Sequence, residues 1–316
     1  MKFPTVVGLL FCSLLVVAQP TLPDLSMSAT GYIENPFVAT QIRVRADAGW
    51  DNPTPDRAEY FYAKCGCFRF LGLDPNAPGP GPGIVTNLRF QEYSAAVEYA
   101  IIPRFSMFAE GPLRAIQPIS FVPAGGNGGI FPDQHGFGDF RSGFKWAVDP
   151  NPNRYITFQF RAYFPTGNPA RGLGTNHYSI EPSLLFQRTL TPRTRLAGQA
   201  TLWIPIGGSS NAPVNNGQFS GDVLTYGLGL TYDLSERRTG VRVTPALEFV
   251  GWNVRSGSVT EATGLVDAAN TNIANLKGGA RVYFGAHDSV YAGYGRQLSH
   301  IGWYRDLVRV EYRHTF

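Results

Sequence analysis

Hydrophobic and polar residues alternate with a period of two from Gln41 almost to the C-terminus. In one such stretch, Ile156 and Phe158 face one side of an extended chain, whereas Thr157 and Gln159 face the other. Successive side chains of a strand point to opposite faces, so the pattern predicts strands with one apolar and one polar face. It predicts about twelve strands, over residues 41–50, 88–100, 105–115, 137–148, 155–165, 177–189, 194–206, 222–234, 239–252, 274–285, 288–298 and 304–316.

The lengths of these strands distinguish between two all-β architectures. Strands of soluble sandwiches usually have about five or six residues. A tilted strand that crosses a bilayer needs about nine to eleven, which is close to the length of most of the predicted strands. The lengths therefore favour a membrane barrel.

The links between the predicted strands alternate between short and long, and only the last link, 299–303, is of modest length. Outer-membrane barrels have short periplasmic turns and long extracellular loops. An even number of strands places both the N-terminus and the C-terminus of the barrel chain in the periplasm. The short links are 101–104, 149–154, 190–193, 235–238 and 286–288, and the long ones are 51–87, 116–136, 166–176, 207–221 and 253–273.

Loop 51–87 leaves the strand count open. Residues 59–63 (Glu-Tyr-Phe-Tyr-Ala) form a candidate short strand, so a barrel of fourteen strands is the alternative to twelve. Residues 74–83 (Asp-Pro-Asn-Ala-Pro-Gly-Pro-Gly-Pro-Gly) cannot enter a ladder, because Pro lacks the backbone donor and Gly weakens a strand.

The N-terminus has the features of a secretory signal peptide. Lys2 precedes an apolar stretch from Val6 to Val17, and Ala18 ends a small-residue cleavage pattern. The alternative is a buried N-terminal strand or helix. We therefore predict a signal peptide over 1–18, a periplasmic N-terminal segment over 19–40, and an outer-membrane β-barrel over 41–316 with the long extracellular loop 51–87.

The last predicted strand ends in an aromatic residue. Phe316 is the final residue, and Tyr312 lies on the same face of this amphipathic strand. The pair resembles the terminal signal of bacterial outer-membrane proteins. The expected partners are thus outer-membrane lipid and, through the C-terminal strand, the barrel-assembly machinery.

Composition excludes several other classes. Only 16% of the residues are charged, and Gly (36) and Pro (24) are abundant, which argues against coiled coils and helical bundles. The net charge of +4 is scattered, so nucleic acid is not an expected partner. Cys65 and Cys67 lack nearby His or Cys and predict no metal site, leaving a strained disulfide or an inert loop feature. No cofactor is expected.

The polar faces of the strands carry the candidate functional residues. In a membrane barrel these faces line the lumen. Two interpretations remain: a ladder of ion pairs that fills a narrow barrel, or a hydrated path with weak anion preference. The lumen-lining candidates are Arg43, Arg45, Arg141, Lys145, Arg161, Arg195, Arg242, Lys277 and Arg281.

Aromatic residues near the strand ends are candidates for the interfacial girdles of such barrels. They are Tyr99, Trp146, Tyr155, Trp203, Tyr232, Trp252, Tyr283 and Phe316.

A catalytic barrel is the least favoured class. His177, Ser179 and Glu181 have the residue types of a hydrolase triad. Residues two apart on one strand rarely converge as nucleophile and base, because a triad is defined by geometry. We therefore expect no catalytic residues and no enzyme activity.

Two short motifs resemble a known family. Residues 136–146 (Gly-Phe-Gly-Asp-Phe-Arg-Ser-Gly-Phe-Lys-Trp) are followed by residues 160–168 (Phe-Arg-Ala-Tyr-Phe-Pro-Thr-Gly-Asn). They are similar to a Gly-Gly-Asp-type strand entry and a Pro-Thr-Gly strand end in the outer-membrane transporter-like family named for the meta-pathway of phenol degradation. The resemblance covers roughly residues 130–316. It implies an outer-membrane channel that admits hydrophobic or aromatic compounds.

The sequence thus predicts a porin-like protein of the bacterial cell outer membrane that lets small solutes enter passively. The alternative is a structural or cell-surface barrel with a plugged lumen, and a barrel lipid hydrolase is a distant third.

Overall fold

The computed structural model describes residues 28–53, 84–122, 133–168, 171–175, 177–206, 221–234, 241–261 and 264–316. In this part of the chain the regular structure consists almost entirely of strands. They are β1 (Gln41–Asn52), β2 (Ile84–Ile102), β3 (Phe105–Val122), β4 (Gln134–Phe137), β5 (Phe140–Asn151), β6 (Arg154–Phe164), β7 (Tyr178–Thr189), β8 (Thr194–Ile206), β9 (Val223–Tyr232), β10 (Val241–Val254), β11 (Ser258–Glu261), β12 (Gly264–Asp267), β13 (Thr271–Phe284), β14 (Asp288–Gln297) and β15 (Asp306–Thr315).

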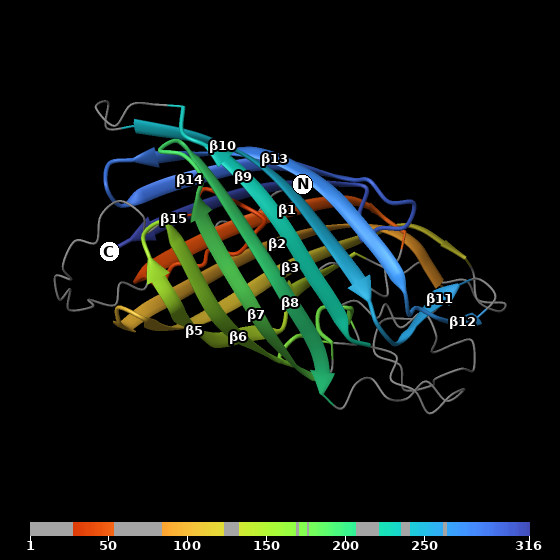
Figure 1. Ribbon diagram of the computed structural model, residues 1–316. Coiled ribbons are helices and arrows are strands. Elements are labelled where there is room, and N and C mark those ends of the chain that lie inside the picture. The colour runs from red at the N-terminus through yellow and green to blue at the C-terminus, as the bar shows by residue number, and fades with distance from the viewer. Residues whose placement is uncertain are drawn as a thin grey trace, which may run out of the picture.

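The strands form a closed antiparallel barrel. Each strand of the wall pairs with its neighbour in sequence, and β1 closes the circle on β15, with Gln41 opposite Thr315 and Trp50 opposite Asp306. β4 and β5 both pair with β3, so together they occupy one position and the wall has twelve. Figure 1 shows the tilt of the strands around the barrel. The predicted twelve-stranded barrel is confirmed.

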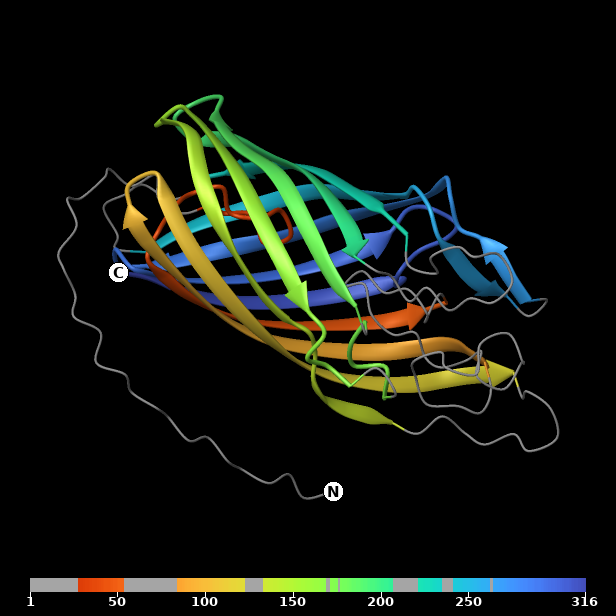
Figure 2. The same ribbon diagram turned by 90° about the horizontal axis from the view of Figure 1, so that it is seen from below.

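The two ends of the barrel differ as the link lengths predict. Short turns such as 103–104 and 285–287 lie at the end where β1 begins and β15 finishes, which we call the turn end. The long links leave from the opposite loop end, where β2 and β3 extend further than expected and β11 and β12 form a separate hairpin. Figure 2 shows both ends. The possible strand at 59–63 and both remaining cysteines lie outside the described residues.

Side chains alternate between the outside and the interior along each strand. On β9, Leu228 and Leu230 are about half exposed, whereas Gly227, Gly229 and Thr231 between them are buried. The outer face is apolar because it meets lipid, and the inner face carries the polar side chains. In the described part of the chain, no helix has the length and apolarity to cross a membrane.

Candidate functional site

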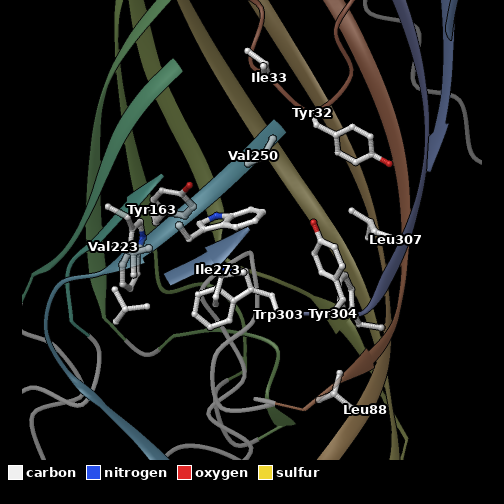
Figure 3. Packing of buried hydrophobic residues seen from close by; sticks show 14 of the residues in the cluster. Tyr32, Ile33, Leu88, Tyr163, Val223, Val250, Ile273, Trp303, Tyr304 and Leu307 are labelled. Carbon is white, nitrogen blue, oxygen red and sulfur yellow. The ribbon is translucent and has the colours of Figure 1, made fainter. Parts of the chain in front are cut away.

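Residues 28–40 run inside the barrel, and we call them the luminal segment. The luminal segment begins near the turn end and leads into β1 (Figure 2), and its Tyr32 and Ile33 lie inside the barrel (Figure 3). Ser28, Tyr32, Ile33 and Phe37 are at most 7% exposed. The sequence assigned this stretch to the periplasm; the structure places its described part in the lumen. It has no regular secondary structure, so its backbone groups need partners on the barrel wall.

Glu248 on β10 accepts hydrogen bonds from three consecutive backbone N–H groups of this segment. Its carboxylate accepts hydrogen bonds from the N–H groups of Gly31 (2.9 Å), Tyr32 (2.9 Å) and Ile33 (2.7 Å). The Tyr291 hydroxyl donates to the same carboxylate at 3.2 Å. Bonds to an ionised acceptor are about twice as strong as neutral ones, so Glu248 is the main anchor of the luminal segment.

Three arginines bind the carbonyl groups of the same stretch. Arg281 on β13 donates to Thr30 O at 3.1 Å. On β15, Arg309 donates to Gly31 O at 2.7 Å, and Arg313 to Ser28 O at 3.3 Å. The wall therefore binds both the donors and the acceptors of this backbone.

Two glycines allow the luminal segment to approach the barrel wall closely. A Cβ on Gly31 would lie 2.1 Å from the Tyr291 ring, so no other residue fits there without displacement. A Cβ on Gly229 of β9 would lie 3.0 Å from both Ile33 Cδ1 and Thr30 Cγ2. The small residues on the inner face of β9 thus shape the groove in which the luminal segment lies.

All nine predicted lumen cations point into the barrel, and most of them are buried. Carboxylates are shared among them: Glu110 lies within 3.2 Å of Arg43, Arg45 and Arg141. This favours the ion-pair ladder of the two sequence interpretations. The further pairs are Lys145–Glu98 (2.9 Å), Arg161–Glu181 (2.6 Å), Arg195–Asp233 (2.7 Å), Arg242–Asp233 (4.0 Å) and Arg281–Glu311 (2.7 Å).

Lys277 has a different environment. Its ammonium lies 4.3 Å from the ring centre of Tyr32, 5.1 Å from that of Trp252 and 5.4 Å from that of Tyr304. Cation–π contacts of this kind are stronger when they are desolvated. Lys277 marks the boundary between the charged ladder and an aromatic region.

An apolar cluster lies inside the loop-end half of the barrel. Trp252 of β10 packs beside Ile273 of β13, and Trp203 of β8 is buried beside Val223 of β9. We call this cluster the apolar compartment; Figure 3 shows its side chains directed into the barrel. Its members include Trp203, Val223, Val250, Trp252, Ile273, Trp303, Tyr304 and Leu307.

Four of the expected girdle residues therefore have the opposite orientation, and one of them is Tyr155, whose hydroxyl accepts a hydrogen bond from Val38 N of the luminal segment at 3.4 Å. Trp203, Trp252 and Tyr283 are at most 4% exposed and point into the lumen, whereas Tyr99 and Trp146 are both 54% exposed on the outside. Trp252 follows Glu248 by four residues on one strand, so both share a face. The phase of alternation, rather than nearness to a strand end, decides the direction.

The link between β14 and β15 folds inward and completes the compartment. Trp303 is 2% exposed and Tyr304 is fully buried. Arg305 anchors the link at the rim through Asp51 (2.6 Å) and Asp306 (2.7 Å). The hydrogen bond to Asp306 and the charge of Asp51 raise the pKa of Arg305, so its guanidinium stays charged at any physiological pH.

A family model now identifies the chain's relatives. The model described as "Putative MetA-pathway of phenol degradation" matches residues 99–300, which is more than half of the chain. The chain belongs to this family. The resemblance suggested by the two sequence motifs is therefore confirmed.

A solved outer-membrane channel has the same fold. The COG4313 outer membrane channel from Pseudomonas putida F1 has a TM-score of 0.52 at 13% identity, covering 94% of this chain and 100% of that one. The NanC porin has a TM-score of 0.47 at 8% identity (87% and 100% covered), and the CymD monoaromatic hydrocarbon channel 0.42 at 11% (88% of each). No curated protein matches the chain. Family and fold together make it an outer-membrane β-barrel protein.

The family motifs meet at the loop end, where they fasten a loop. Asp139 accepts hydrogen bonds from Gly167 N (2.9 Å), Thr175 N (2.8 Å) and Thr175 Oγ1 (2.8 Å). Thr166 donates to the carbonyl of Gly138 at 3.1 Å. The Gly-Asp and Pro-Thr-Gly motifs thus have a structural role in this chain, holding residues 165–168 and 171–175 against the wall.

The Ser–His pair does approach bonding distance. Ser179 Oγ lies 3.1 Å from His177 Nδ1, but Nδ1 also lies 3.0 Å from Tyr178 O. Glu181 does not orient His177, because it is bonded to Arg161 and Tyr163. All three candidates are at most 5% exposed, so a substrate has no access to them as they stand. Among the described residues, no group of His, Cys, Asp and Glu side chains is arranged to hold a metal ion.

The C-terminal strand presents its aromatic residues outward. Phe316 is 49% exposed and Tyr312 is 41% exposed on the lipid face. Tyr312 donates to Asp288 at 2.6 Å, and Phe316 N donates to Thr40 O at 2.9 Å. Their role in assembly remains a prediction.

Proposed function

We propose that this protein is a channel through which small hydrophobic or aromatic solutes enter passively across the outer membrane. The observation that carries the proposal is the apolar compartment. Lumens of outer-membrane barrels are ordinarily polar. Here three tryptophans (Trp203, Trp252 and Trp303) are buried inside the barrel instead.

The energetics favour an apolar solute in this place. Burial of apolar surface is worth roughly 25 cal/mol per Å². A monoaromatic ring therefore gains several kcal/mol on entering such a compartment, whereas a sugar or an ion loses hydration there. Typical ligand sites combine apolar walls with a few polar groups, and Lys277 at the base of the compartment is one such group.

A structural barrel with a plugged lumen is the second candidate. The luminal segment favours it, since it fills the turn-end half of the barrel with hydrogen-bonded chain. The two candidates differ in whether solutes pass, so a transport measurement separates them.

The test uses cells that express the protein in a lipopolysaccharide-containing outer membrane. The probe is N-phenylnaphthylamine, an apolar aromatic dye that fluoresces once it has crossed this barrier. Wild-type protein should accelerate the fluorescence rise. Val250→Thr, an isosteric change within the compartment, should slow it several-fold, because a buried hydroxyl raises the polarity of the path.

Val44→Thr is the matched control, since Val44 is 49% exposed on the lipid face. It should leave dye entry unchanged. Retention of periplasmic enzymes shows that the membrane is intact. If wild-type protein and an empty vector give the same rate, the channel proposal fails and the plugged barrel stands.

A further inference from the structure

A small polar cavity lies beside the luminal segment in the turn-end half of the lumen. Its volume is about 20 Å³, enough for one or two water molecules. Charged and amide side chains from β1, β2, β5 and β6 line it together with one aromatic ring. The lining residues include Glu34, Arg43, Phe108, Lys145, Gln159 and Arg161.

The carboxylate of Glu34 occupies one side of this cavity between two guanidinium groups. Arg43 on β1 lies 3.3 Å from Glu34 Oε2, and Arg161 on β6 lies 2.8 Å from Glu34 Oε1. The two arginines belong to the barrel wall, whereas Glu34 belongs to the luminal segment. A carboxylate held by one guanidinium on each oxygen has the geometry by which proteins bind carboxylate ligands.

The amide of Gln159 is the second observation. It lines the same cavity at 1% exposure, and neither its Nε2 nor its Oε1 bonds to any described residue. A buried amide without partners is costly, and such a group in a native structure requires an explanation. Its N–H donors are available to a ligand oxygen that enters the cavity.

The aromatic ring of Phe108 in the cavity lining is the third observation. The Arg161 guanidinium lies over the Phe108 ring at 5.6 Å from its centre, so this ring borders the same two-arginine site. A ligand that carries an apolar ring next to its carboxylate would find a flat apolar surface there.

We propose that Glu34 occupies a binding site for small organic monocarboxylates, which displace it from Arg43 and Arg161. The inference deepens the proposed function, on which it rests, by adding aromatic acids such as benzoate to the solutes. The carboxylate of the ligand takes the place of the Glu34 carboxylate, and the Gln159 amide donates to it. No covalent bond changes.

The charges around the site select a single negative charge. When Glu34 leaves, Arg43 keeps Glu110 (2.9 Å), Arg161 keeps Glu181 (2.6 Å), and Lys145 keeps Glu98 (2.9 Å). Displacement therefore removes one negative charge and leaves room for one. Dicarboxylates and phosphate dianions would bring an excess charge next to these carboxylates, so they bind less well.

Calorimetric titration of the folded, detergent-solubilised protein with benzoate tests the site without requiring transport. Glu34→Gln removes the internal competitor at constant size and should tighten benzoate binding by about tenfold. Adding Arg43→Gln to that variant should abolish the gain, and Glu110 still has Arg45 and Arg141 as partners. Heat-modifiable migration on a gel confirms that each variant is folded.

Two further variants isolate the site. Gln159→Leu, in the Glu34→Gln background, should weaken benzoate binding several-fold, since it removes the amide donor without altering charge. Arg195→Gln is the control: this lumen arginine pairs with Asp233 and does not line the cavity, so benzoate affinity should stay the same.

The remaining outcomes overturn the inference. Equal benzoate affinities of wild type and Glu34→Gln would show that Glu34 does not occupy a ligand site. A gain for uncharged benzyl alcohol equal to that for benzoate would assign the effect to the ring alone, and tighter binding of phthalate would refute selection of a monoanion. The proposed function has its own test in dye entry, so either result can fail without the other.

Discussion

The hydrogen bonds between Glu248 and the luminal segment predict how a single substitution changes the conductance. Glu248→Gln keeps the shape of the side chain but removes its charge. With the amide oxygen at the Oε2 position, the bonds from Tyr32 N and Ile33 N persist as neutral ones. The bond from Gly31 N is lost, because the amide nitrogen is itself a donor.

The magnitude follows from these three bonds. A hydrogen bond to a charged group contributes about 1.5–3 kcal/mol, and a neutral one about 0.5–1.5 kcal/mol. Exchanging three charged bonds for two neutral ones weakens the binding of the luminal segment by about 5 kcal/mol. This raises the ratio of detached to bound segment by about 10³- to 10⁴-fold.

Planar-bilayer recording measures this ratio as the fraction of time spent at a higher conductance. Glu248→Gln should show long, wide openings that wild type shows only rarely. Asp233→Asn is the matched control, because Asp233 is a lumen carboxylate that binds Arg195 and Thr244 rather than the luminal segment. Identical traces for Glu248→Gln and wild type, from protein that is folded by heat-modifiable migration, would refute the anchoring role of Glu248.

Two further predictions address the seat and the family motif. Gly229→Ile should also unseat the luminal segment and raise the conductance, because its side chain would collide with Ile33; a wild-type trace would contradict the fit described above. Asp139→Asn should weaken the attachment of residues 165–168 and 171–175 by about 1–3 kcal/mol, because one carboxylate acceptor becomes a donor facing Gly167 N or Thr175 N. The temperature at which the barrel loses its compact gel mobility should fall accordingly. An unchanged transition temperature would assign that aspartate a role other than loop fastening.

The barrel could be predicted from the sequence because every strand repeats the same alternation of apolar and polar side chains. Lipid selects apolar residues on one face, so the period of two survives over strands such as 155–165, and the structure places β6 at Arg154–Phe164. The same alternation predicts that the side chain of Arg161 points into the lumen. It also determines the directions of Trp203 and Trp252, which share their phases with Arg195 and Glu248, but nearness to a strand end suggested a girdle instead.

The position of the luminal segment inside the barrel could not be predicted in this way. Its backbone, rather than its side chains, makes most of the bonds to the wall, so residues 28–33 carry no periodic pattern. One signal did exist. Gly227 and Gly229 leave the middle of the inner face of β9 without side chains, and glycines inside a strand indicate the close approach of another backbone.

The contacts of the luminal segment also determine the order in which the protein assembles. Gly31 is bonded to Glu248 and Arg309, which lie 217 and 278 residues further along the chain, and Ser28 to Arg313 at a separation of 285. Its binding groove exists only after β15 has joined β1, and pairings over such separations form slowly. We therefore expect residues 28–40, which are synthesised before every strand of the wall, to become ordered only after the barrel has closed. A newly closed barrel would then pass through a stage in which its lumen is open.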